Sequence, residues 1–176
     1  MGTDAQHHLP WFEGAFTAMF LHASWTHILG NMLFLWIFGN NVEDALGRLR
    51  YLLFYLASGL AATLGQTIVT LHWAGPAAAS VPNLGASGAI AGVLGAYFVL
   101  LPRASVLTLI FFFFVPLPAF VFLGIWFVFE LWEGGFSLTQ PNAGGGVAFF
   151  AHITGFVFGV LLVRPLTVRQ PLQPSW

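Results

Sequence analysis

The stretch PNLGASGAIAGVLGAYFVLL, residues 82–101, decides the fold. It places one serine, Ser87, among glycines and alanines at the start of an apolar run. Serine has a weak helix propensity, and a hydroxyl group that faces lipid needs a hydrogen-bond partner. Ser87 is therefore either a polar contact between two closely packed helices or a group held in place to react. The rest of the chain has to decide between these two readings.

The composition of the whole chain indicates a membrane protein. Its 176 residues are 58% hydrophobic and only 6% charged, whereas about a quarter of the residues in a soluble domain are charged. About 20 apolar residues suffice to cross a bilayer. Apolar runs predict five transmembrane helices, of which the third and fourth are short, at residues 24–41, 52–72, 86–101, 117–132 and 147–163. We therefore expect an all-α polytopic membrane protein with a single domain.

The basic residues predict how the chain is oriented. All five are arginines, and they follow the first, third and fifth predicted helices: Arg48, Arg50, Arg103, Arg164 and Arg169. An alternating topology places them on one face, which the positive-inside rule makes cytoplasmic. We expect an outer loop at residues 1–21, a helical core at 22–163 and a cytoplasmic C-terminal tail at 164–176.

One segment of the apolar sequence is not expected to be an ordinary transmembrane helix. The run IFFFFVPLP, residues 110–118, ends at two prolines. Proline removes a backbone donor and disrupts a helix interior. This run is predicted to form a membrane-embedded hairpin or an interfacial segment.

Polar side chains inside predicted helices are candidate site residues, because burying them in a membrane is costly. They are His22, His27, Asn31 and His152. His27 and Asn31 are four residues apart and share one helix face, whereas His22 is expected at the boundary between loop and helix. Each of them alone is better explained by a hydrogen bond between helices.

Small residues favour a site assembled from two helices. They recur at helical spacing after Ser87 and after His152, so both helices can pack backbone to backbone on the faces that carry these two residues. These small residues are Ala91, Gly95, Gly155 and Gly159. Close packing would bring the hydroxyl and the imidazole within the range of about 2.6–3.2 Å that proton transfer needs.

Several other chemistries lack their motifs. The sequence has no HExxH zinc motif and no cysteine, and its two aspartates, Asp4 and Asp44, do not lie deep in a predicted helix. Residues 85–89 read GASGA rather than the GxSxG of soluble hydrolases. Five dispersed arginines and no lysine do not support nucleic-acid binding. We expect neither a metal nor a cofactor.

Four segments together resemble the rhomboid family of intramembrane serine proteases. The resemblance runs from about residue 16 to residue 162, and its segments appear in order at suitable separations. They are HASWTHILGN at 22–31, FGNNVEDALG at 38–47, GASG at 85–88 and AHITGFVFG at 151–159. The resemblance implies a rhomboid-like helical bundle in which Ser87 starts a short helix that opens into a water-filled cavity.

The resemblance also implies roles for individual residues. Ser87 would be the nucleophile and His152 its general base, a dyad without a carboxylate. His27 and Asn31 would donate hydrogen bonds to the oxyanion, together with the Ser87 backbone N–H, and His22 would support them.

Further positions match or depart from the family pattern. Gly85 and Gly88 would permit the tight turn into the serine helix, and Glu43 would be a structural residue near the inner end of its helix. Glu130 stands where relatives often have glutamine, and Thr154 replaces a common glycine. The match opens at what would be the second of six helices, so we expect the first helix of the family core to be missing.

The function implied is cleavage of the transmembrane segments of other proteins, within the bilayer of a bacterial inner membrane. The alternative is a catalytically inactive relative that binds membrane-protein clients. A third class, a transporter or metal site built from His22, His27 and His152, would lack the buried carboxylate or thiolate that many metal sites use.

Overall fold

The fold is taken from a computed structural model, which describes residues 11–73, 85–139 and 148–170. In chain order its elements are α1 (Trp11–Ala18), α2 (Trp25–Phe34), the π-helical segment η1 (Leu35–Gly39), α3 (Asn40–Leu46), α4 (Arg48–Trp73), α6 (Ser87–Leu100), β1 (Ser105–Ile110), β2 (Phe113–Pro118), α7 (Ala119–Thr139) and α8 (Phe149–Leu166).

The helices form a polytopic membrane bundle, as predicted. Among the described residues, α4, α7 and α8 are long and apolar enough to cross a membrane, with 26, 21 and 18 residues. The helix α6 is apolar but has only 14 residues, and the first predicted span is continuously helical from α2 through η1 to α3, with the π-helical segment in its middle. The count of five transmembrane helices therefore stays a prediction.

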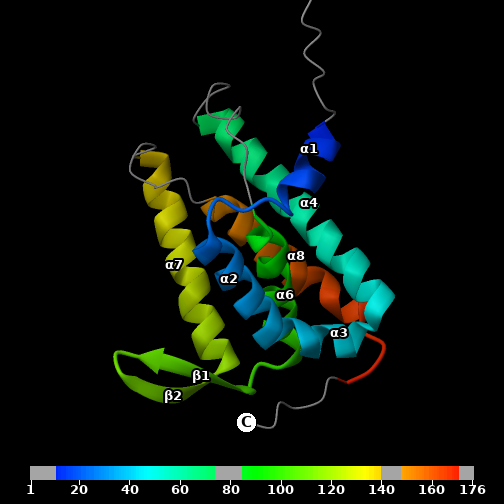
Figure 1. The fold of residues 1–176 in the computed structure, drawn as a ribbon, viewed down its shortest axis with the longest axis vertical. Coiled ribbons are helices and arrows are strands. Elements are labelled where there is room, and N and C mark those ends of the chain that lie inside the picture. The colour runs from blue at the N-terminus through cyan, green and yellow to red at the C-terminus, as the bar shows by residue number, and fades with distance from the viewer. Residues whose placement is uncertain (1–10, 74–84, 140–147, 171–176) are drawn as a thin grey trace, which may run out of the picture.

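The short helix α6 lies at the centre of the bundle. Every residue from 88 to 97 is buried, because α4 and α8 pack along it and α2 and α7 stand at its other sides (Figure 1). Its sequence explains this position, since small residues allow neighbouring backbones to approach closely.

At their glycines, the backbones of α6 and α8 are in direct contact, which confirms the predicted close packing. A Cβ added at Gly155 would lie within 3.0 Å of the carbonyl oxygen of Gly88, and one added at Gly159 would lie equally close to that of Gly92. On its other side, α6 meets α4, where Gly88 faces the side chain of Ala62. The central helix is thus held between two neighbours with no room for larger residues.

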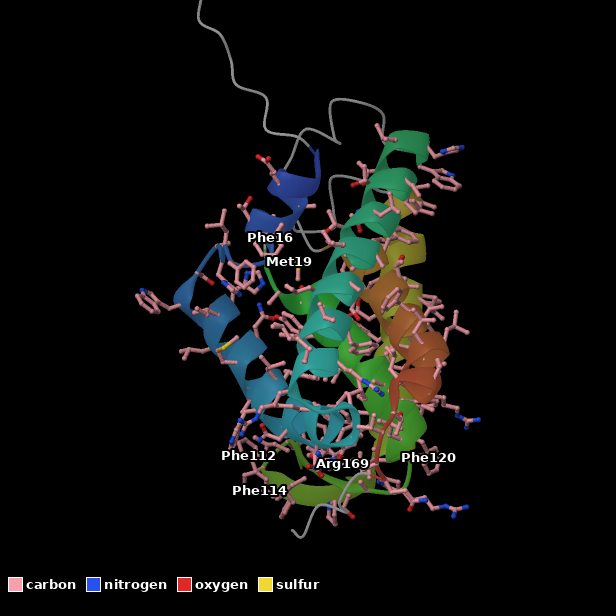
Figure 2. The ribbon with its side chains drawn as sticks, turned by 90° about the vertical axis from the view of Figure 1, so that its right-hand side faces the viewer. Phe16, Met19, Phe112, Phe114, Phe120 and Arg169 are labelled. Carbon is pink, nitrogen blue, oxygen red and sulfur yellow. The ribbon has the colours of Figure 1, made fainter. Side chains whose placement is uncertain are left out.

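The phenylalanine-rich run forms a β-hairpin rather than a helix. Strands β1 and β2 pair antiparallel, with Ser105 opposite Pro118 and Ile110 opposite Phe113. The side chains from Phe111 to Phe114 are exposed, and Figure 2 shows Phe112 and Phe114 at the same end of the molecule as Arg169. The prediction allowed a hairpin or an interfacial segment here but did not foresee β-strands, so the chain is not entirely helical.

The predicted short fourth helix is wrong. The sequence indicated residues 117–132, but α7 runs from Ala119 to Thr139. It continues because Gly134 is buried in a contact with Phe149 and Ile153 of α8. Tertiary packing compensates for the low helix propensity of the glycines in this last part.

The two ends of the core also differ from the prediction. Residues 1–21 were expected to be an outer loop, yet they contain α1, whose Ala15 and Ala18 are buried. The tail expected from residue 164 starts as the last turn of α8, and the backbone N–H groups of Val168 and Arg169 donate to the carbonyl oxygen of Ala45.

The arginines lie at one end of the bundle. Figure 1 shows that α4 and α7 run in one direction and α6 and α8 in the other. The starts of α4 and α7 therefore share an end with the last turn of α8 and with the hairpin. Ser87 begins α6 at the opposite end.

Candidate active site

Ser87 is the first residue of α6, and the turn before it requires glycine. Gly85 has a φ of +115°, where side chains are strained, and its N–H donates to the Ala18 carbonyl at 2.9 Å. A Cβ at Gly85 would also lie 2.7 Å from the ring of His27. The turn thereby places Ser87 at a helix N-terminus, directly beside α2.

His152 lies in the first turn of α8, facing Ser87. Its Nε2 is 2.8 Å from Ser87 Oγ, within the range for proton transfer. From α4, the Gln66 side chain accepts a hydrogen bond from the Ala151 N–H at 3.1 Å. Gln66 therefore holds the start of α8, and with it the backbone of His152.

Thr154, which the resemblance marked as a departure from the family pattern, packs directly over Gly65 of α4. A Cβ at Gly65 would collide with the Thr154 side chain. The larger residue on α8 is thus accommodated by the missing side chain on α4, and the first turn of α8 keeps its place.

A carboxylate lies beside this pair, and sequence reasoning missed the contact. Glu130 Oε2 lies 2.9 Å from His152 Nδ1, and the Glu130 side chain is only 7% exposed. The expected dyad did not include this carboxylate, so the structure adds a neighbour of His152 that the sequence prediction left out. Trp126, one turn earlier on α7, lies beside the same imidazole, with ring centroids 6.2 Å apart. The signal was present in the sequence, since an ionisable residue inside an apolar helix marks a site by default.

The α2 helix brings the other predicted polar residues to the same place. The Ser24 side chain caps α2 by accepting from the His27 N–H at 3.1 Å. His22 precedes the helix, as expected, and its ring meets that of His27 edge-on at 5.1 Å. Asn31 follows one turn later and is buried. A Cβ at Gly85 would lie 3.7 Å from Asn31 Nδ2, so the amide borders the turn that leads to Ser87.

Unpaired polar nitrogens lie near the turn that leads to Ser87. Within the described part of the chain, Asn31 Nδ2 and His22 Nε2 are buried without a hydrogen-bond partner. The first N–H groups of α6 need partners outside the helix, and Ala86 at the cap position has no side-chain acceptor to offer. Buried donors of this kind suit an oxygen that develops negative charge.

A small cavity of about 20 Å³ adjoins Ser87. This volume is enough for one water molecule. Its lining includes Ser87, Gly85 and Thr63, together with the Met19 side chain, which packs against Gly59 of α4. Figure 2 shows Met19 on the segment after α1, beside α4.

Two further residues named by the resemblance are not part of this group: Gly88 packs between helices, and Glu43 lies on α3. Gly88 faces Ala62 and Ala151, which makes it a contact point between helices. Glu43 lies on α3, where Arg48 approaches it at 3.9 Å, close to the arginine-bearing end. Among the residues that the structure describes, no three His, Asp or Glu side chains converge as metal ligands.

The assembled groups can perform acyl transfer. A serine hydroxyl lies in contact with an imidazole nitrogen, the second nitrogen contacts a carboxylate, and unpaired donors lie near the serine. Nucleophile, base, orienting group and oxyanion donors are the parts that this chemistry uses.

Comparison with known proteins identifies relatives of this chain. A family profile described as Rhomboid domain matches residues 11–169. Rhomboid protein 1, mitochondrial, from Saccharomyces cerevisiae is 33% identical over 149 residues, which cover 81% of this chain and 38% of that protein. Rhomboid-like protein 11, chloroplastic, from Arabidopsis thaliana is 29% identical over 170 residues, covering 89% of this chain and 53% of that protein.

A bacterial relative carries an enzymatic name. Rhomboid protease GluP from Bacillus subtilis is 38% identical over 80 residues, which cover 46% of this chain and 14% of that protein. The chain thus spans about half or less of the length of these three relatives. Because two of them are named for mitochondria or chloroplasts, the comparisons do not favour the expected bacterial inner membrane. The profile match covers nearly the whole chain, which therefore belongs to the rhomboid family.

Proposed function

We propose that this protein is an intramembrane serine endopeptidase that hydrolyses peptide bonds in the transmembrane segments of other membrane proteins. The observation that carries the proposal is the distance of 2.8 Å between Ser87 Oγ and His152 Nε2. A hydroxyl becomes an effective nucleophile when a base can take its proton as it attacks.

The first half of the reaction acylates the serine. Ser87 Oγ bonds to the carbonyl carbon of the substrate while its proton passes to His152 Nε2, and the carbonyl π electrons move onto the oxygen. Asn31 Nδ2, the Ser87 N–H and the His27 ring donate hydrogen bonds to that oxygen. When the oxyanion collapses, His152 gives the proton to the leaving amine and the peptide C–N bond breaks.

The second half consumes one water molecule. The cavity of about 20 Å³ beside Ser87 gives a water a position next to the acylated oxygen. From there the water moves to the ester carbon, and His152 removes its proton as it attacks. The proton then returns to Ser87 Oγ as the ester bond breaks, and the product carboxylic acid is released.

The length of α6 supports a substrate that enters from the membrane. Fourteen residues span about 21 Å, which is shorter than the hydrocarbon core of about 30 Å. If the far end of α6 lies at the arginine-bearing surface, Ser87 lies below the opposite surface. We propose that this opposite surface is the outer one, because arginines accumulate on the cytoplasmic side.

The test uses purified protein and a transmembrane peptide with a fluorescent reporter. Ser87→Ala and His152→Ala should each abolish cleavage, and the double variant should be scarcely slower than either, because the two residues act as one unit. Ser137→Ala and His72→Ala are matched controls, since the Ser137 hydroxyl donates to the Gly134 carbonyl oxygen and the His72 ring packs against Trp73; they should cleave normally.

Two outcomes would overturn the proposal. The first is substantial cleavage by Ser87→Ala. The second is a folded wild-type protein that binds membrane-protein segments without cutting any of them, which is the behaviour of an inactive relative.

A further inference from the structure

Glu130 is the one buried carboxylate of the described residues, and its partner is the imidazole of the candidate base. It lies on α7, one turn after Trp126, with its Oε2 2.9 Å from His152 Nδ1. The other imidazole nitrogen, Nε2, is 2.8 Å from Ser87 Oγ. The ring therefore stands between an acceptor-only carboxylate and a hydroxyl.

Burial makes this contact unlike an exposed ion pair. The side chains of His152 and Glu130 are 14% and 7% exposed, whereas the two other ion pairs of the described residues involve arginines that are mostly exposed. Water does not compete freely for the carboxylate, and a hydrogen bond to an ionised acceptor is about twice as strong as a neutral one.

From this geometry we infer that Glu130 is a positioning residue for His152, an inference that rests on the proposed function. An ionised carboxylate has no proton to give, so it accepts the N–H of Nδ1 and fixes the neutral imidazole in that tautomer. The lone pair of Nε2 then points at the Ser87 hydroxyl, as a general base requires.

The carboxylate also acts after the proton has moved. When Ser87 Oγ attacks, its proton passes to Nε2 and the ring becomes positively charged. The negative charge of Glu130 stabilises this cation, as a carboxylate does in soluble serine hydrolases, without itself taking up the proton. Ser87, His152 and Glu130 would then be in contact one after another, and only Ser87 and His152 would exchange a proton.

The alternative role for Glu130 is purely structural, as an anchor between α7 and α8. Two substitutions separate the roles. Glu130→Gln keeps an oxygen that can accept from Nδ1 but removes the charge, whereas Glu130→Leu removes both. Glu133→Gln is the matched control, because it removes a carboxylate from the same helix one turn further on.

The kinetic experiment measures kcat and KM with the transmembrane reporter peptide on folded, monodisperse protein. General-base catalysis contributes about 10²–10⁴-fold to a rate. We expect kcat to fall about 10-fold in Glu130→Gln and 10²-fold or more in Glu130→Leu, with KM nearly constant and Glu133→Gln unaffected. Wild-type kcat per folded molecule in both Glu130 variants, with lowered melting temperatures, would show a structural anchor and overturn the inference.

A spectroscopic experiment makes the outcome independent of proteolysis. In protein labelled with ¹⁵N-histidine, the ring-nitrogen shifts report which nitrogen carries the proton, and loss of a signal pair in His152→Gln assigns His152. We expect the Nδ1–H tautomer in the wild type and a mixture of tautomers in Glu130→Leu. If the leucine variant does not fold, Glu130→Gln should also give a mixture, because its amide can either accept from Nδ1 or donate to it. Protonation of His152 at Nε2 alone in the wild type would refute the role of Glu130. Failure of the wild type to cleave, with the Nδ1–H tautomer present, would count against the proposed function instead.

Discussion

Gly155→Ala perturbs the contact that sets the distance between Ser87 and His152. The added Cβ would lie within 3.0 Å of the Gly88 carbonyl oxygen, whereas ordinary contact begins at 3.4 Å. The obstacle is backbone, so it cannot rotate away, and α6 and α8 must separate by at least 0.4 Å, the difference between these two limits. Gly88 and Gly155 are each within three residues of the reacting pair.

The same displacement carries the reacting groups to the limit of proton transfer. If α6 and α8 move as rigid bodies, the distance of 2.8 Å between Ser87 Oγ and His152 Nε2 grows to about 3.2 Å or more. Misplacing catalytic groups by about 1 Å can cost 10²-fold in rate, so we expect kcat to fall by about 10-fold to 10²-fold. Forcing a methyl group into a packed contact should also lower the unfolding free energy by about 1–3 kcal/mol.

The assay compares Gly155→Ala with Gly124→Ala on α7. A Cβ at Gly124 meets nothing within 4 Å, so this control should keep the wild-type kcat and gain stability from alanine's higher helix propensity. Both kcat and the melting temperature are measured on the same preparations in detergent. A Gly155→Ala protein with wild-type kcat and melting temperature would refute the claim that backbone packing of α6 against α8 sets the site.

Three further outcomes follow from the placement of other residues. Asn31→Ala should lower kcat by about 10²–10³-fold while leaving KM and folding largely intact, as loss of an oxyanion donor does; unchanged turnover would remove Asn31 from the site. Because the chain has no cysteine, single cysteines can report topology: in intact cells Thr139→Cys should react with an impermeant maleimide and Val168→Cys should not, and reaction of both would contradict the predicted orientation. A spin label on Phe112→Cys should be more accessible to oxygen than to a polar nickel complex, because the exposed phenylalanines favour lipid while the outer strand edges keep the hairpin at the interface. A label on Val168→Cys reports the water-exposed tail, and equal accessibilities at the two positions would contradict this prediction.

The central helix could be predicted closely from the sequence. The expected span at 86–101 corresponds to α6 at Ser87–Leu100. Its small residues also indicated that neighbouring helices would pack closely on more than one side. The same strips on α6 and α8 correctly predicted that the two backbones would meet. Such patterns predict tertiary contacts, because the spacing of the small residues defines a helix face and their size determines how close a neighbouring helix can come.

The rotation of α7 could not be predicted in the same way. Phenylalanine, leucine, valine and tryptophan occur on all its sides, so hydrophobic periodicity gives no inward face. The inward direction of Glu130 emerges only when Leu123 and Gly134 pack against the core. The end of α7 lies seven residues beyond the predicted one, because the glycines after Glu133 have low helix propensity and only the packing of Gly134 against α8 keeps them helical.

The contact between Glu130 and His152 could not be predicted from the spacing of residues in the sequence either. The two residues are 22 positions apart on different helices, and the distance between them depends on how α7 and α8 cross. Ser87, His27 and Asn31 could be predicted as site residues because each belongs to a short local motif. Glu130 belongs to none, and only its cost within an apolar helix distinguished it.

The most direct measurement of the central claim is covalent labelling of Ser87 with a fluorophosphonate, followed by peptide mass mapping. If Ser87 is a nucleophile activated by His152, the wild-type protein should gain one adduct on Ser87. Labelling should be absent in Ser87→Ala and slowed strongly in His152→Ala, while Ser137→Ala labels normally. An adduct that persists in Ser87→Ala, or a wild-type protein that cleaves its substrate but never labels at Ser87, would contradict the claim.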